Sequence, residues 1–182
     1  MRGRRSVLVA AGVLVLLVVA GGAGFAIARS TPSLEAVGPT SVSGTEATAV
    51  FQVGDRTVRQ IRYDDGGTLR YTFRMANNSP IPVTVLGLDE EQSDPRLFTL
   101  VSLTGGTIGS GGSIDLTLSM DMGGCETLSS RSGSFVSTIT VRTPHAGLFE
   151  DVVEVALPEE VHTGSPREAF CPNSTATSRP QG

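Results

Sequence analysis

The heptapeptide LRYTFRM at residues 69–75 alternates between two kinds of side chain. Arginine or threonine fills every second position, and the positions between them are apolar: Leu69, Tyr71, Phe73 and Met75. Because successive side chains of a β-strand point to opposite faces of a sheet, the pattern predicts a strand with one face in a core and one in water. Residues 114–121 repeat the pattern, so we expect a second strand of the same kind.

Shorter segments of strand-type sequence lie on both sides of this stretch, separated by turn residues. We expect further strands at residues 47–53, 58–63, 83–88, 97–103, 135–142 and 149–157. No segment after residue 28 has a helical period, so the pattern predicts an all-β domain. About seven to nine short antiparallel strands are typical of a β-sandwich with two sheets packed face to face.

Two glycine-containing segments are interpreted as connections. The cluster Asp-Asp-Gly-Gly at residues 64–67 predicts a hairpin turn between strands 58–63 and 69–75, because glycine tolerates positive φ. Residues 104–113 are expected to form a flexible loop. They lack the Gly-Lys-Ser/Thr sequence of a phosphate-binding loop and lead into a strand rather than a helix.

The N-terminal region carries a different signal. Residues 6–28 contain no charged residue, and the arginines that flank them are Arg2, Arg4, Arg5 and Arg29. A helix of this length spans roughly 34 Å, about the thickness of the hydrocarbon core of a bilayer. The positive-inside rule therefore predicts a single-pass signal-anchor helix at residues 6–28, with the basic residues 1–5 in the cytoplasm.

The remainder of the chain is then expected outside the cytoplasm. We expect a spacer at residues 29–44, which are rich in Pro, Ser, Thr and Gly, a sandwich at residues 45–171, and a disordered tail at residues 172–182. Cleavage after Ala28 is an alternative, since Ala26-Ile27-Ala28 fits the small-residue pattern of a signal-peptidase site. Cleavage would make the domain a secreted one.

Composition excludes several kinds of chemistry. The chain has a net charge of −4 and no basic cluster, so we expect no nucleic-acid partner. All of its basic residues apart from histidine are arginines. Without lysine it can form no Schiff base with pyridoxal phosphate, no Ser-Lys dyad and no Walker-type phosphate site.

Few residues are candidates for a site. Cys125 and Cys171 are the two cysteines, and an even pair in an oxidising compartment predicts a disulfide between them. The two histidines, His145 and His162, have no catalytic motif around them, so we expect no catalytic residues and no cofactor. The weak metal candidates are acidic residues that lack the regular spacing of a calcium loop: Asp89, Glu90, Glu91 and Asp94.

Three segments together suggest a family. The run YTFRMANNSPIPVTVLGL at residues 71–88, FTL at 98–100 and GGSIDLTL at 111–118 resemble the immunoglobulin-like domains of the hydin and abnormal-spindle (ASH-like) type. The chain as a whole is similar to small membrane-anchored envelope proteins of the actinobacterial type. The likeness covers roughly residues 45–157, although Ser-Gly-Gly at 110–112 stands where the pattern has Pro-Gly. It implies an Ig-like sandwich with scaffolding or adhesive work and transfers no catalytic residue.

We therefore expect a cell-membrane protein whose extracytoplasmic Ig-like domain acts in recognition or scaffolding at the cell envelope, without catalysis. Its expected partners are the membrane, through the N-terminal helix, and another envelope protein or a cell-wall component. The alternative is a secreted or anchored domain that binds calcium or another metal, or assists an enzyme, through residues 89–94.

Overall fold

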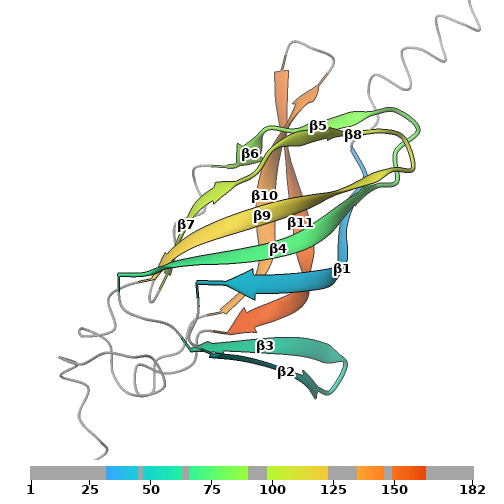
Figure 1. Cartoon of the computed structure of the whole chain (residues 1–182). Coiled ribbons are helices and arrows are strands. Elements are labelled where there is room, and N and C mark those ends of the chain that lie inside the picture. Colours follow the sequence, from blue (N-terminus) through green and yellow to red (C-terminus); the bar gives the residue numbers. More distant parts are fainter. Residues whose placement is uncertain are drawn as a thin grey trace, which may run out of the picture.

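The computed structural model describes residues 32–44, 47–62, 66–89, 98–122, 135–145 and 149–162 (Figure 1). These residues form eleven strands: β1 (Leu34–Ser43), β2 (Ala47–Val53), β3 (Arg56–Arg62), β4 (Thr68–Asn77), β5 (Val83–Val85), β6 (Gly87–Leu88), β7 (Phe98–Leu103), β8 (Gly106–Ile108), β9 (Ser113–Met122), β10 (Phe135–His145) and β11 (Phe149–His162). Within these ranges, no helix has the length and apolar character to cross a membrane. The expected anchor at residues 6–28, its flanking arginines and the tail at residues 172–182 lie outside the described residues.

The strands form two larger sheets and a short ribbon. One sheet has four strands in the order β1-β4-β9-β7, the other has five in the order β2-β3-β11-β10-β6, and β5 pairs with β8. All pairs are antiparallel except β3 with β11, which run parallel. The described part of the chain is therefore all-β, as predicted for the domain, with more strands than the expected seven to nine and one parallel pair.

Strand β4 is an inner strand of the four-stranded sheet, between β1 and β9. The alternation in its sequence is confirmed, because the four apolar residues of the pattern are fully buried: Leu69, Tyr71, Phe73 and Met75. Strand β9 pairs with it so that Phe73 lies opposite Leu116. The rings of Tyr71 and Phe73 stack, with centroids 5.8 Å apart.

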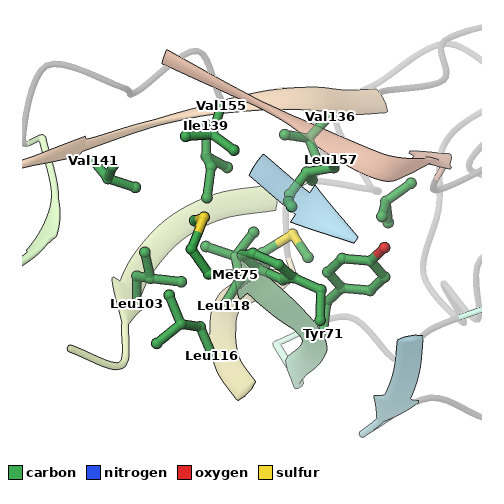
Figure 2. Close-up of a cluster of buried hydrophobic side chains, with 14 of the residues drawn as sticks. Tyr71, Met75, Leu103, Leu116, Leu118, Val136, Ile139, Val141, Val155 and Leu157 are labelled. Carbon is green, nitrogen blue, oxygen red and sulfur yellow. The ribbon is translucent and has the colours of Figure 1, made fainter. Parts of the chain in front are cut away.

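The two larger sheets face each other across one hydrophobic core. Figure 2 shows Met75 and Leu118 of the four-stranded sheet opposite Ile139 and Val155 of the five-stranded sheet. All four side chains are buried. Facing sheets joined by one core are consistent with a β-sandwich.

The predicted spacer at residues 29–44 is wrong for most of its length, because Leu34–Ser43 form β1. β1 pairs antiparallel with β4, and its register shifts between Val37 and Ser41. Ala36 is the one buried residue of this strand, Leu34 and Val42 are partly buried against the core, and Gly38-Pro39 interrupts any regular apolar alternation. Backbone hydrogen bonds to β4 hold the strand in place, and such bonds are independent of side-chain pattern. The folded domain therefore begins before residue 45.

The predicted hairpin between residues 58–63 and 69–75 is also wrong. β3 and β4 belong to different sheets, and β3 pairs with β2 and β11 instead. Gly66 and Gly67 connect the sheets beside β9, where Gly66 N donates to Met122 O at 2.7 Å and Met122 N donates to Gly67 O at 2.8 Å. Gly66 and Gly67 therefore lead into β4 beside β9 and do not close a hairpin with β3.

The remaining corrections concern strand lengths. The expected flexible loop at residues 104–113 contains β8, whose Ile108 is buried in the core. Residues 83–88 form two strands, β5 and β6, on either side of Leu86. β11 continues to His162 rather than ending at residue 157, because its last residues pair with both β10 and β3.

Candidate functional site

Strand β2 is the outermost strand of the five-stranded sheet, and its described side chains are exposed. Its side chains at residues 48–53 are all exposed, including Val50 at 48%, Phe51 at 42% and Val53 at 43%. β3 lies on one side of β2, and no described strand pairs with its other side. Figure 1 shows the β2–β3 ribbon beyond β1 at the lower end of the molecule. Within the described part of the chain, β2 therefore presents both a free backbone edge and apolar side chains.

Each face of β2 carries at least one exposed apolar side chain. Val50 lies opposite Arg59, and Phe51 lies opposite Val58. Directly opposed residues of an antiparallel pair share a face, and Arg59 points towards the four-stranded sheet, as its bonds to Thr40 show. Val50 is therefore on the inner face, while Phe51 and Val53 are on the outer face. Val50 is exposed although it is on the inner face, so the four-stranded sheet does not cover this part of β2.

The sequence of β2, ATAVFQV, has no charged residue, proline or glycine. Soluble proteins usually protect a free sheet edge with charges, proline or a bulge, since unpaired backbone groups bind other strands. β1, at the edge of the four-stranded sheet, has Gly38-Pro39 and a register shift at the same place. β2 has no such protection, and this difference makes it the candidate binding edge.

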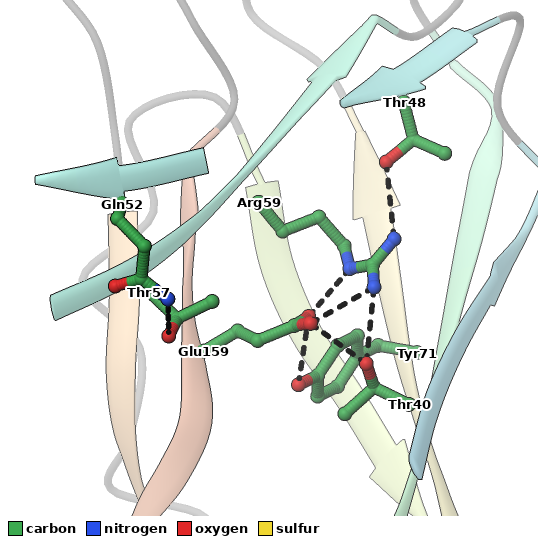
Figure 3. Close-up of polar contacts among 7 residues, drawn as sticks. All are labelled: Thr40, Thr48, Gln52, Thr57, Arg59, Tyr71 and Glu159. Carbon is green, nitrogen blue, oxygen red and sulfur yellow. Dashed lines mark hydrogen bonds and ion pairs between the residues drawn. The ribbon is translucent and has the colours of Figure 1, made fainter. Parts of the chain in front are cut away.

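A buried ion pair fixes the strand that supports β2. Arg59 of β3 and Glu159 of β11 have side chains only 11% and 10% exposed (Figure 3). The guanidinium of Arg59 donates from Nε to Glu159 Oε2 and from Nη2 to Glu159 Oε1, the second bond being 2.9 Å. Two parallel bonds of this kind give a charged pair fixed geometry as well as attraction. Arg59 also reaches β2, where Nη1 donates to Thr48 Oγ1 at 3.3 Å.

Glu159 joins four strands through its carboxylate. Besides the bonds from Arg59, it accepts a hydrogen bond from Thr40 Oγ1 of β1 at 2.8 Å and a longer one from the Tyr71 hydroxyl of β4 at 3.4 Å. The hydrogen bond to Glu159 raises the pKa of Arg59, and burial, followed by the charge of Glu159, raises the pKa of Tyr71. Arg59 thus stays charged and Tyr71 stays neutral at physiological pH. The arrangement is a structural clamp that holds β3, and through it β2, against the body of the domain.

Weaker polar contacts lie on both faces of the same region: Arg56 and Glu160 are on the outer face, and Gln52 and Thr57 are on the inner face. Arg56 Nη1 lies 2.8 Å from Glu160 Oε2, with the arginine largely exposed. Gln52 Nε2 donates to Thr57 Oγ1 at 2.8 Å. These contacts tie β3 to β11 and β2 to β3 without covering Phe51 or Val53, which remain exposed.

Most residues predicted from the sequence as sites lie outside the described ones. Cys125 and Cys171 are among them, as are Glu90, Glu91 and Asp94, so the disulfide and the acidic metal site stay predictions. Asp89 is described, and its backbone N–H donates to Thr140 O at 3.0 Å. Within the described ranges, no group of three or more His, Cys, Asp or Glu residues could hold a metal ion. His162 ends β11 opposite Gln60.

Sequence reasoning identified β2 as a strand but missed its exposure. The signal that could have indicated it is the uncharged sequence with apolar residues at both even and odd positions, seen in Val50 beside Phe51. The partnership of Arg59 and Glu159 left no such signal, since the two residues are separated by 100 positions.

Comparison with known proteins finds no family model and no curated protein that matches this chain. The likeness to hydin-type immunoglobulin-like domains therefore stays a prediction, and the functional argument depends on the geometry of the described residues.

Proposed function

We propose that this protein is a membrane-anchored, extracytoplasmic Ig-like β-sandwich that acts in recognition or scaffolding at the cell envelope, without catalysis. The observation that carries the proposal is the free, uncharged edge of β2 with its exposed Val50, Phe51 and Val53. The location at the envelope depends on the sequence of residues 1–28.

The mode of binding that suits such an edge is strand addition. An extended segment of a partner pairs with the free backbone groups of β2, and its side chains pack beside the exposed apolar ones. Backbone hydrogen bonds supply affinity, and side-chain fit supplies specificity. The clamp between Arg59 and Glu159 favours this mode, because it holds the supporting strand β3 in place before a partner arrives.

The proposal is tested by placing a charge on the edge. The full-length protein carrying Val50→Lys is expressed in a Gram-positive host, crosslinked in the membrane fraction and compared with the unaltered chain. Val152→Lys is the matched control, since Val152 is an equally exposed valine (54%) on β11, away from β2. We expect specific crosslinked products with the unaltered chain and with Val152→Lys, and their loss with Val50→Lys.

Two results would contradict the proposal. Equal crosslinking by the Val50→Lys and Val152→Lys variants would remove β2 as the docking edge. Recovery of the protein from the medium with Arg29 as its first residue would contradict the anchor and favour a secreted domain.

A further inference from the structure

We infer that β2 pairs antiparallel with β2 of a second copy of this chain, in a register centred on Val50. The two five-stranded sheets then form one continuous sheet across a twofold axis. This inference rests on the proposed function, because it names the partner of the same binding edge.

The sequence of β2 is complementary to itself in this register. Ala49 of one copy lies opposite Phe51 of the other, so a small side chain meets a large one on the outer face. On the inner face Thr48 lies opposite Gln52, and Val50 lies opposite Val50 of the second copy. Cross-strand pairs that match in size and polarity stabilise a sheet. Every pair in the register combines residues of the same face, as a twofold axis perpendicular to the sheet requires.

Other registers fit less well. Shifting the second copy by one residue would oppose inner-face residues to outer-face residues. Shifting the second copy by two residues would centre the pairing on Phe51 or on Ala49. Either shift would leave part of the seven-residue strand unpaired. Only the register centred on Val50 pairs the whole strand.

Charge also favours a second copy. A heterologous partner is free to carry either sign of charge, but a second copy always brings its own charges into opposition at a twofold axis. Strand β2 has none between Ala47 and Val53, so self-pairing meets no like-charge repulsion within the strand. Two-fold homodimers are the commonest symmetric assemblies, and each interface uses the same patch twice.

The interface is small, so its strength depends on tethering. The edge of a seven-residue strand buries less area than a standard stable interface. We therefore expect the dimer to form mainly when two copies share a membrane, where anchoring raises their effective concentration.

The register is tested by disulfide trapping of the full-length chain in membranes. Opposed residues of an antiparallel pair have Cα atoms about 4.5–5.5 Å apart, within the range that a disulfide spans. Val50→Cys is expected to give a covalent dimer severalfold above the unaltered chain, which measures the background from Cys125 and Cys171. Val152→Cys, an exposed site away from β2, is expected to stay at that background.

A second pair of variants checks the register itself. Differently tagged copies carrying Ala49→Cys and Phe51→Cys are expected to crosslink to each other more than either variant crosslinks to itself. A crosslink from Val50→Cys to a chain of another mass would overturn the second-copy inference and leave β2 as a docking edge. Background crosslinking by Val50→Cys, together with unchanged capture by Val50→Lys, would overturn the inference and the proposed function together.

Discussion

Strands β4 and β2 have similar sequence patterns and opposite environments. Both place apolar residues at alternate positions, with Phe73 in β4 and Phe51 in β2. Phe73 is fully buried, whereas Phe51 is 42% exposed. β4 has strands on both sides and a second sheet opposite, while β2 has β3 on one side and extends past the opposite sheet. Alternation therefore predicts a strand, but the neighbours of the strand decide whether its apolar face becomes core or surface.

Because of this difference, β4 contributes to the stability of the domain and β2 is available for binding. Apolar area on β4 is removed from water on folding and stabilises the domain by roughly 25 cal/mol per Å². The exposed part of the apolar area on β2 stays in water in the single chain, so this part can contribute only when a partner covers it. Single substitutions in the two strands should separate stability from binding.

The largest effect is expected from truncating the two phenylalanines. Phe73→Ala removes a fully buried ring and should lower the free energy of unfolding by about 3–5 kcal/mol. Phe51→Ala should change it by less than about 1 kcal/mol, because the ring is already partly in water. Urea unfolding of both variants followed by circular dichroism measures the difference. Equal losses would show that β2 is covered in the folded domain, contrary to the comparison.

The clamp beneath β2 is the next test. Glu159→Gln leaves Arg59 as a buried charge without its counterion, and breaking a buried pair in this way typically costs about 3–5 kcal/mol. Glu160→Gln is the control, since its partner Arg56 is 61% exposed and such pairs contribute about 0–1 kcal/mol. Urea unfolding gives both free energies, and faster hydrogen exchange in β2 and β3 should accompany only the first substitution. Similar free energies for the two variants would mean that the pair at Glu159 is no stronger than a surface one.

The parts that could be predicted from the sequence are those where side chains alternate against a core. β4 and β9 meet that condition, with Leu69, Phe73 and Leu118 buried as their positions required. β1 could not be found in this way, since it contributes one buried apolar residue and is held by the backbone of β4. β8 is short and lies among glycines, whose small size permits close approach: a Cβ on Gly105 would lie 2.7 Å from Val85 O.

The binding edge and the clamp depend on which strands become neighbours. Arg59 and Glu159 come together because β3 pairs in parallel with β11, and Thr40 reaches them from β1 of the opposite sheet. The local sequence pattern of β3 does not show that it pairs with β11. The same alternation of residues would also fit an exposed antiparallel hairpin. The expected hairpin of residues 58–63 with 69–75 was wrong for this reason.

The end of β4 offers a smaller test. Asn77 is fully buried, and its Nδ2 donates to Ile81 O at 2.8 Å and Ile108 O at 3.1 Å, while its Oδ1 accepts from Ser79 N. Asn77→Ala leaves these backbone groups without their partner and should lower the free energy of unfolding by about 1–3 kcal/mol. Asn78→Ala, at the exposed neighbouring position, should change it by about 0.5 kcal/mol or less. Chemical unfolding of the pair measures this, and a larger loss for Asn78→Ala would reverse the assignment.

The smallest effect is expected at high pH, from the hydroxyl of Tyr71. Burial raises the pKa of Tyr71 above its ordinary value of 10.0, and Glu159 adds to the shift. Above pH 10 the unfolded chain therefore releases this proton while the folded chain retains it. The sign follows directly: the contribution of Tyr71 to stability is complete below pH 10 and is lost as the pH rises above that value. The slope reaches at most about 1.4 kcal/mol per pH unit for one group.

The measurement uses the absence of tryptophan and the presence of two tyrosines, Tyr63 and Tyr71. In a Tyr63→Phe variant, any tyrosinate absorbance comes from Tyr71, and it should appear only together with loss of the β-sheet signal. Adding Tyr71→Phe should remove the part of the alkaline decline in stability that this hydroxyl causes. Tyrosinate absorbance near pH 10 in the folded Tyr63→Phe protein would mean that water reaches Tyr71. β4 would then be open to water at Tyr71, the residue of β4 that contacts Glu159, and the comparison of a buried β4 with an exposed β2 would be wrong there.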